Sequence, residues 1–234
     1  MTPRIEVAGI DSLVLRLFER IDERNMPWLL AASQRLREAF GPALLDLVPS
    51  YTTLLLHYDL TLLDDRQARR RIHQAFEGLQ PATGNSARQH EIPVWYDPSV
   101  GPELEALGAR SGLGVAGVIA RHSGHTYQVF ALGFAPGFAF MGQVDEILAS
   151  PRLQTPRQQV PAGSLGIADR QTAIYPLASP GGWNLIGRSP ARLFDRQLDG
   201  YSLCQPGDRV RFVAIDHAEF VRLGGDDRPF EARP

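Results

Sequence analysis

Arginines, glycines and one histidine are the residues of this chain whose types and spacing suit chemistry. The stretch "HSGH" places His122 and His125 three residues apart at the end of an apolar helical pattern. A histidine at a helix end can transfer protons near neutral pH. Val118 and Ile119 precede His122 on the same helical face, a pattern that fits a core histidine equally well. No third ligand follows at a spacing typical of a metal site, so we predict none.

Two proline-rich stretches contain arginines. Arg157 lies in "PRLQTPRQQVPAGS" and Arg188 in "SPGGWNLIGRSP". The planar guanidinium suits a carboxylate or a phosphate, and neighbouring prolines hold such a side chain on a rigid loop. For an isolated arginine, a solvated surface turn is the simpler interpretation.

Two glycine-containing motifs have a chemical and a structural interpretation. Gly181 and Gly182 can expose backbone N–H groups to an anion, and Trp183 can form the wall of a pocket, but their spacing alone favours a hairpin turn with a core tryptophan. Ser164 in "AGSLG" resembles a nucleophile elbow. Ala162 stands where that motif has glycine, and a strand rather than a helix is expected to follow, so a structural turn is favoured.

Composition excludes several classes of protein. The chain has 234 residues, of which 44% are hydrophobic and 21% charged, with a net charge of -2, as expected for one large or two small globular domains. All 24 basic residues are arginine, which excludes a lysine-bearing P-loop and a Schiff-base enzyme. Cys204 is the single cysteine, so no internal disulfide forms. Scattered basic residues and short apolar runs predict a cytoplasmic protein that binds neither nucleic acid nor membrane.

The first 96 residues predict a ferredoxin-like βαββαβ domain. Strands are expected at 12–18, 43–50, 51–59 and 90–97, with helices over 27–40 and from Asp64 onwards. Asn25 is the expected N-cap of the first helix. The expected apolar face of the second helix consists of Ala68, Ile72, Ala75, Phe76 and Leu79.

Residues 97–234 predict a second domain of a different kind. Two short helices are expected first, in "GPELEALGARSG" and "GVAGVIARHSG". Short strands follow, the last of them in "AEFVRLG", and residues 133 to 190 hold 8 of the 22 glycines and 7 of the 18 prolines. Many short strands with turn signals between them predict a β-barrel or β-sandwich.

Longer stretches of the same region resemble a known family. "LGFAPGFAFMG", "TPRQQVPAGSLGIADRQTAIYP" and "SPGGWNLIGRSPARLFD" are similar to signatures of the KipI/PxpB family, which includes carboxyltransferase subdomain C and D proteins. The resemblance continues through "RHSGHTYQVF" and "QPGDRVRFVAI" and covers nearly the whole chain. It implies an α+β fold, in which a ferredoxin-like N-terminal domain is followed by a cyclophilin-like β-barrel domain.

The resemblance also implies a function. Family members act as the B subunit of 5-oxoprolinase, as allophanate hydrolase subunit 1 or as inhibitors of a sporulation histidine kinase. We therefore expect an ATP-hydrolysing cyclic amidase subunit that opens 5-oxoproline to glutamate together with a PxpC/KipA-type and a PxpA-type subunit. ATP, alone or with Mg²⁺, is the expected cofactor, with none tightly bound. Two alternatives stay open: regulation of a sensor histidine kinase, and a carboxyltransferase-type component acting on urea or allophanate.

Residue type and family motif together suggest roles for single side chains. We expect Arg157 and Arg188 to clamp phosphate or a carboxylate, Gln171 to hydrogen-bond the lactam amide, and His122 to move a proton. The expected substrate-binding residues are Pro161, Gly163, Ser164, Tyr175, Gly181, Gly182 and Trp183.

Overall fold

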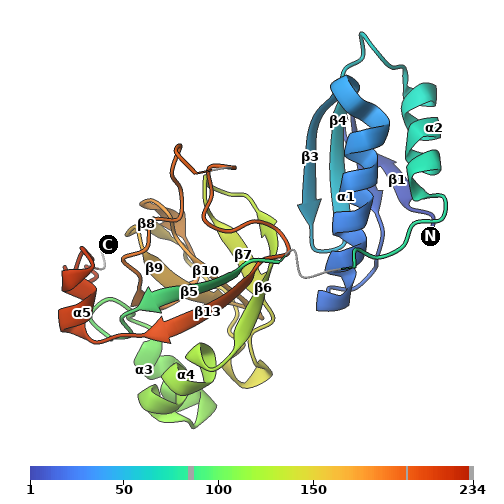
Figure 1. Ribbon diagram of the computed structural model, residues 1–234. Coiled ribbons are helices and arrows are strands. Elements are labelled where there is room, and N and C mark those ends of the chain that lie inside the picture. The colour runs from blue at the N-terminus through green and yellow to red at the C-terminus, as the bar shows by residue number, and fades with distance from the viewer. Residues whose placement is uncertain (84–86, 199, 232–234) are drawn as a thin grey trace. The chain divides into compact units, whose positions relative to one another are not determined.

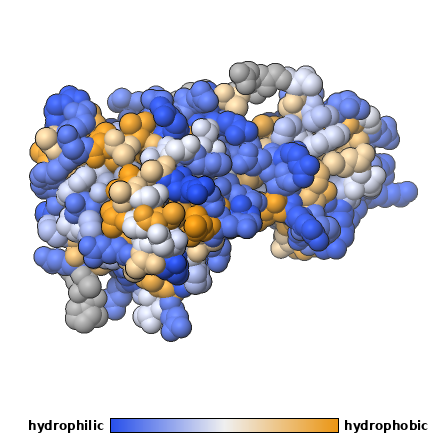
Figure 2. Space-filling model, turned by 90° about the horizontal axis from the view of Figure 1, so that it is seen from below, coloured by the Kyte–Doolittle hydropathy of each residue, from blue (hydrophilic) through white to orange (hydrophobic). Residues whose placement is uncertain are grey.

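The chain folds into two compact units, Met1–Ser86 and Ala87–Pro234 (Figure 1). The structure is a computed structural model that describes residues 1–83, 87–198 and 200–231. Over these residues no helix is both long enough and apolar enough to cross a membrane. The face seen in Figure 2 is mostly hydrophilic, with apolar side chains gathered in small patches.

The first unit is a four-stranded antiparallel sheet with two helices. The strand order is β1-β2-β4-β3. The buried positions alternate along the central strands, at Leu13, Leu15, Leu54 and Leu56, as expected when one face of a sheet packs on helices. The elements are β1 (Arg4–Val7), β2 (Ser12–Arg16), α1 (Met26–Phe40), β3 (Leu44–Ser50), β4 (Thr53–Tyr58) and α2 (Asp65–Phe76).

Both helices begin near their predicted positions. Helix α2 starts with a capping box, in which the Asp64 carboxylate accepts from the Gln67 N–H (2.6 Å) and the Gln67 side chain accepts from the Asp64 N–H (2.9 Å). Four residues of its predicted apolar face, Ala68, Ile72, Ala75 and Phe76, are buried on the helix, whereas Leu79 is buried but lies beyond the end of α2. Asn25 occupies the predicted N-cap position of α1, but its side chain makes no capping hydrogen bond and donates instead to the Arg20 carbonyl (2.7 Å).

The strand expected at residues 90–97 belongs to the other unit. Strand β5 (Gln89–Val94) pairs in parallel with β13 (Arg209–Ala214), and the outer position beside β2 is taken by β1. The first unit thus keeps the sheet of a ferredoxin-like fold, with an N-terminal strand in place of the fourth. The expected boundary between 96 and 97 shifts to Ser86 and Ala87 for the same reason.

The second unit is built on a curled seven-stranded sheet. Its strand order is β12-β9-β10-β7-β6-β13-β5, and every pairing except β13 with β5 is antiparallel. A separate pair consists of β8 and β11. The further elements are α3 (Leu104–Ser111), α4 (Gly114–Ser123), β6 (Thr126–Leu132), β7 (Ala139–Gly142), β8 (Arg157–Val160), β9 (Ser164–Ala168), β10 (Gln171–Ile174), β11 (Ser179–Gly181), β12 (Asn184–Arg188) and α5 (His217–Arg222).

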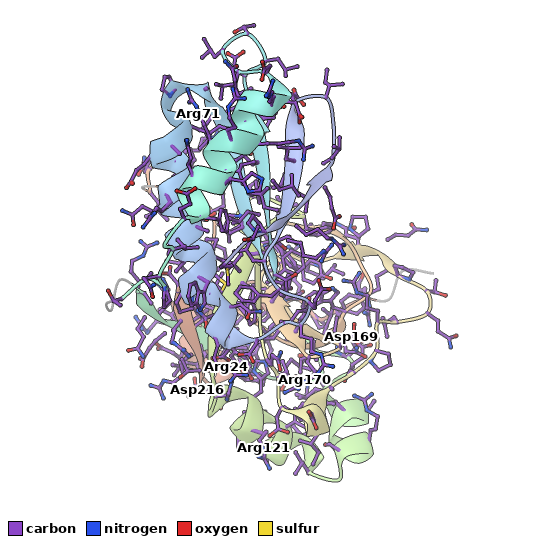
Figure 3. All side chains as sticks on the ribbon, turned by 90° about the vertical axis from the view of Figure 1, so that its right-hand side faces the viewer. Arg24, Arg71, Arg121, Asp169, Arg170 and Asp216 are labelled. Carbon is purple, nitrogen blue, oxygen red and sulfur yellow. The ribbon has the colours of Figure 1, made fainter. Side chains whose placement is uncertain are left out.

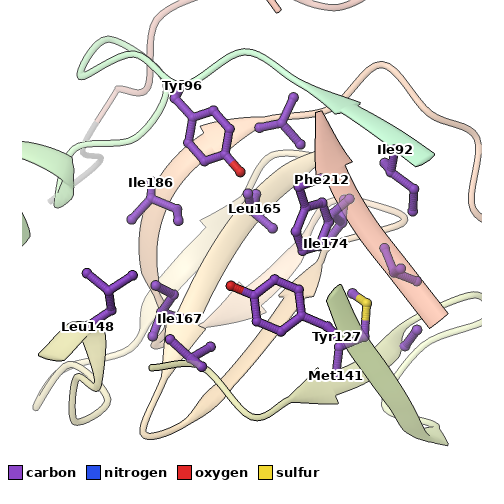
Figure 4. Packing of buried hydrophobic residues seen from close by; sticks show 14 of the residues in the cluster. Ile92, Tyr96, Tyr127, Met141, Leu148, Leu165, Ile167, Ile174, Ile186 and Phe212 are labelled. Atoms are coloured by element: carbon purple, nitrogen blue, oxygen red, sulfur yellow. The ribbon is translucent and has the colours of Figure 1, made fainter. Parts of the chain in front are cut away.

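The inside of the curled sheet is the main core of this unit. Side chains from distant strands, such as Leu165, Ile174 and Phe212, converge there (Figure 4). An isolated bridge between Trp95 and Arg188 links the two edges of the sheet, β5 and β12. The predicted fold class is therefore confirmed.

One predicted strand of this unit is wrong. The stretch "AEFVRLG" contains most of helix α5, and Asp216 caps this helix by accepting from the Glu219 N–H (2.8 Å). Its short alternation of apolar and polar residues fits a strand, but the capping aspartate decides the local structure.

Candidate functional site

Four residues form a row across the strands where the curled sheet closes. Arg188 faces Ser164 in the antiparallel register of β12 and β9. On one side of this pair, the Tyr175 N–H donates to the Ser164 carbonyl (2.9 Å). On the other side, Trp95 and Arg188 exchange two backbone hydrogen bonds of 2.9 and 2.8 Å. The backbone therefore fixes Arg188 at the junction of the two sheet edges.

The Arg188 guanidinium is buried and is not paired with a carboxylate in any described contact. Its Nη1 donates to the backbone carbonyls of Asp226 (2.6 Å) and Arg228 (2.8 Å). Nε and Nη2 are buried and find no hydrogen-bond partner in the described part of the chain. Burial lowers the pKa of Arg188 from its ordinary 12.5, and the charge of Asp226 opposes part of that shift. A buried cation with two donor nitrogens unpaired is costly unless an anion pairs with it.

The Ser164 side chain projects from the sheet on the same side as that of Arg188. Residues facing each other in an antiparallel pair project to the same side, with Cβ atoms about 5 Å apart. The Ser164 side chain is fully buried, and its hydroxyl also has no partner among the described residues. Two neighbouring polar side chains thus have unused hydrogen-bonding capacity. Arg188, Ser164 and Gly163 are called the Arg188 site below.

The turn at Pro161–Ser164 positions the serine. The Ser164 N–H donates to the Pro161 carbonyl (3.3 Å), and the Gly163 N–H donates to the Tyr175 carbonyl (2.7 Å). Gly163 has φ +80, and a Cβ there would lie 2.4 Å from the Ser189 carbonyl oxygen and 3.3 Å from Arg188 Cγ. Only glycine lets the turn approach the arginine this closely.

Arg157 is neutralised by Glu103, a residue that no sequence motif singled out. Its Nη2 forms an ion pair with Glu103 Oε1, and its Nη1 donates to the Trp183 carbonyl (3.1 Å). The second oxygen of Glu103 accepts from the Leu185 N–H (2.8 Å). Arg157 therefore holds strand β12 in place and is not a free anion clamp. Glu103 lies 54 positions from Arg157 in the chain, and no motif links the two residues.

Two aromatic side chains, those of Tyr175 and Trp183, pack with Gly181 and Gly182 beside Arg157. Trp183 is 4% exposed and meets Phe138 edge to face, at 5.7 Å between ring centroids. A Cβ on Gly181 would lie 2.2 Å from the Tyr175 hydroxyl oxygen, and the Gly182 carbonyl accepts from the Leu153 N–H (2.7 Å). Gly181 thus permits close packing against Tyr175, and Trp183 is the core tryptophan of the structural interpretation.

His122 lies in the core of the second unit. The Tyr96 hydroxyl is 2.8 Å from Nδ1, and Nε2 is 3.0 Å from the Thr172 hydroxyl, which donates to the Gly166 carbonyl (3.1 Å). This network assigns the proton to Nε2 and makes Nδ1 an acceptor. Burial lowers the pKa of His122 from 6.5 to about 3. The histidine is therefore neutral, and both ring nitrogens are hydrogen-bonded. This arrangement fits a core histidine rather than one that transfers protons.

Gln171 lies at the other end of the β9–β10 hairpin from the Arg188 site. It pairs with Ala168, whereas Ser164 lies at the start of β9. Four residues of strand separate the two ends by roughly 13 Å. Figure 3 labels Asp169 and Arg170 in the turn that precedes Gln171. The structure thus brings together Arg188, Pro161, Gly163 and Ser164, but not Gln171 or His122.

Comparisons with known proteins place the chain in a family. The model of the carboxyltransferase domain, subdomain C and D, matches residues 3–204. The chain is 34% identical to the B subunit of 5-oxoprolinase from Bacillus subtilis, covering 93% of this chain and 95% of that protein. It is 38% identical to the protein of the same name from Escherichia coli O157:H7, covering 90% and 95%.

Solved structures agree. The crystal structure of TTHA0988 superposes with a TM-score of 0.76 at 40% identity, over 88% of this chain and 40% of that longer chain. The urea amidolyase of K. lactis shares the fold, with a TM-score of 0.76 at 15% identity over 97% of this chain and 16% of that one. By its sequence motifs, its matching family model and its similarity to named relatives, the chain belongs to the KipI/PxpB family of carboxyltransferase-domain proteins.

Proposed function

We propose that this chain is the PxpB-type component of an ATP-dependent 5-oxoprolinase, which opens 5-oxoproline to glutamate together with a PxpC/KipA-type and a PxpA-type subunit. Relatives that match over nine-tenths of the chain are named as the B subunit of 5-oxoprolinase, which supports this role. In this reaction ATP transfers its terminal phosphoryl group to the lactam carbonyl oxygen and leaves as ADP. Water then adds to the carbonyl carbon, the ring C–N bond breaks, and phosphate is released with glutamate.

The observation that carries the proposal is the state of Arg188. 5-Oxoproline is a five-membered lactam with one carboxylate, and a guanidinium with adjacent free N–H groups is the side chain best suited to that carboxylate. Arg188 offers Nε and Nη2 for such a pair, and Ser164, which faces Arg188 across the two strands, has a hydroxyl with no partner among the described residues. The chain thus supplies substrate binding and orientation.

The fit of the chain to ATP is poorer. The sequence contains no lysine and therefore no P-loop, and Arg157, the second expected clamp, is paired with Glu103. We place the nucleotide at a surface shared with the companion subunit, and the proton transfers on groups outside the Arg188 site.

The test is a reconstituted complex with Arg188→Met, measured as ATP hydrolysis that depends on 5-oxoproline. Losing a hydrogen bond to a charged group costs about 1.5–3 kcal/mol, so the KM for 5-oxoproline rises roughly tenfold or more. Arg192→Met is the matched control, because that side chain is 76% exposed and pairs with Asp195 at the surface. An unchanged KM in Arg188→Met contradicts the proposal.

The same preparation separates the alternatives. Turnover of urea or allophanate in place of 5-oxoproline supports a carboxyltransferase-type component. Absence of turnover, combined with inhibition of a sensor histidine kinase, supports a regulatory protein.

A further inference from the structure

The end of the described chain lies across the Arg188 site. After α5, residues 225–230, called the tail segment here, run in no helix or strand. The carbonyls of Asp226 and Arg228 are the two acceptors of Arg188 Nη1. The tail segment is therefore what buries the guanidinium on this side.

Besides its two bonds to Arg188, the described contacts of the tail segment include one exposed ion pair, backbone hydrogen bonds at Gly225 and Phe230, and the packing of Phe230 against the buried cluster around Trp183. His217 Nε2 and Asp227 Oδ2 are 3.0 Å apart, and both side chains are at least half exposed. The Phe230 N–H donates to the Ser99 carbonyl (2.6 Å), and its ring centroid lies 5.0 Å from Arg157 Cζ. Exposed ion pairs contribute little to stability, and a segment outside regular structure opens more easily than a core strand.

The tail segment satisfies Arg188 incompletely. Nη1 donates to two neutral carbonyls, while Nε and Nη2 have no partner among the residues described. The two carboxylates of the segment are used elsewhere, since Asp226 pairs with Arg228 and Asp227 with His217. A ligand carboxylate can pair with both free nitrogens and accept from Ser164, in bonds stronger than those to neutral carbonyls.

We propose that the tail segment is a displaceable cover over an anion-binding site formed by Arg188 and Ser164, and that a small carboxylate ligand takes the place of the tail carbonyls. The identity of the ligand as 5-oxoproline rests on the proposed function, whereas the exchange of tail for carboxylate does not. Binding then has two steps: the tail segment leaves, and the carboxylate engages the guanidinium. A substitution that weakens the contacts of the tail segment strengthens ligand binding, because a smaller fraction of the molecules has the Arg188 site covered.

Calorimetry on the full chain tests this with three probes: 5-oxoproline, cyclopentanecarboxylate (the carboxylate without the lactam) and 2-pyrrolidinone (the lactam without the carboxylate). Phe230→Ala and a chain ending at Gly224 are expected to bind 5-oxoproline about three- to tenfold more tightly than the wild type. Arg188→Met weakens binding of 5-oxoproline roughly tenfold or more in each background. Leu223→Ala, at an exposed apolar residue just before the segment, leaves the affinity unchanged.

Hydrogen exchange gives a second readout. With 5-oxoproline bound, the amide of Phe230 and its neighbours exchange faster, because the tail segment has left, while the amides around Ser164 exchange more slowly. Unchanged or slower exchange in the tail segment on ligand binding overturns the proposal.

The outcomes separate the two proposals. Arg188-dependent binding of 5-oxoproline that neither tail variant strengthens refutes the displaceable cover and keeps the proposed function. If cyclopentanecarboxylate binds as well as 5-oxoproline and releases the tail segment equally, the cover stands and the substrate assignment falls. If no probe binds any variant, or 2-pyrrolidinone binds as well as the two carboxylates, the carboxylate site itself is refuted.

Discussion

His122, Arg157 and Arg188 are all largely buried in the second unit, but they differ in what satisfies them. His122 has one partner on each ring nitrogen, and Arg157 has a carboxylate and a carbonyl. Arg188 has only two backbone carbonyls among the described residues. A buried cation without a counter-ion costs more free energy than a neutral hydrogen-bonded histidine or an ion-paired arginine. Of the three side chains, Arg188 therefore gains the most from binding an anionic ligand.

The burial of His122 makes the stability of the second unit depend on pH. Its pKa is about 3 when folded and 6.5 ordinarily, so between these values the unfolded chain holds a proton that the folded chain excludes. The free energy of unfolding therefore falls as the pH falls below 6.5, by on the order of 1.4 kcal/mol per pH unit.

Urea unfolding at pH 7 and pH 5 measures this dependence. His122→Gln is expected to show a shallower loss of stability on acidification than the wild type. His73→Gln, at an exposed histidine of α2 in the first unit, should keep the wild-type dependence. Equal pH dependence in all three proteins contradicts the prediction.

Glu103 lies in the turn just before α3, but we expect it to contribute substantially to the free energy of unfolding. Glu103→Ala removes the charge that neutralises Arg157 and the acceptor of the Leu185 N–H, so we expect a loss of about 2–4 kcal/mol in the free energy of unfolding. The control is Glu105→Ala, an exposed glutamate in the first turn of α3. Similar unfolding midpoints for the two variants count against the ion pair.

At the scale of elements, β12 is held against its neighbours by close backbone approaches. A Cβ on Gly101 would lie 2.3 Å from the carbonyl carbon of Ile186, and one on Gly187 would lie 2.7 Å from the Trp95 carbonyl oxygen. The turn before α3 and the end of β5 thus pack directly on the backbone of the strand that contains Arg188. These contacts set the position of the Arg188 site.

Gly101→Ala tests that packing. The added methyl group forces backbone movement, and we expect the variant to lose about 2 kcal/mol or more of stability and to bind 5-oxoproline more weakly. Gly133→Ala should change neither quantity, since the nearest atom to its Cβ is 3.9 Å away. Denaturant unfolding and calorimetry measure the two effects.

Local signals predict some elements and fail for others. The helices α1 to α4 follow from apolar spacing and turn residues close to them in the sequence. Strand β5 looks like any other strand, and its place in the second unit depends on β13, 120 residues further along. For the Arg188 site, the sequence indicates an arginine and glycines near turns. It does not indicate that the arginine is buried, because that burial depends on Trp95 and on the tail segment, which are distant in the sequence.

At the scale of the whole molecule, each unit has its own strand pairings. A chain beginning at Ala87 retains every strand of the seven-stranded sheet, whereas one beginning at Asp97 lacks β5 and the Trp95–Arg188 bridge. We expect the first to unfold cooperatively and the second to be unstable or aggregated, because β13 becomes an unprotected edge. Circular dichroism melting compares them, and cooperative melting by the shorter chain contradicts this assignment of β5.

The parallel pairing of β5 with β13 also bears on synthesis at the ribosome. Every helix and strand of the first unit precedes Ser86, so this unit can fold while the rest of the chain is still being translated. The second unit cannot place β5 until residues 209–214 leave the exit tunnel. During that interval β5 has no strand to pair with, and unpaired strand edges of a nascent chain are prone to aggregate. We therefore expect chaperones to matter most at this stage of synthesis.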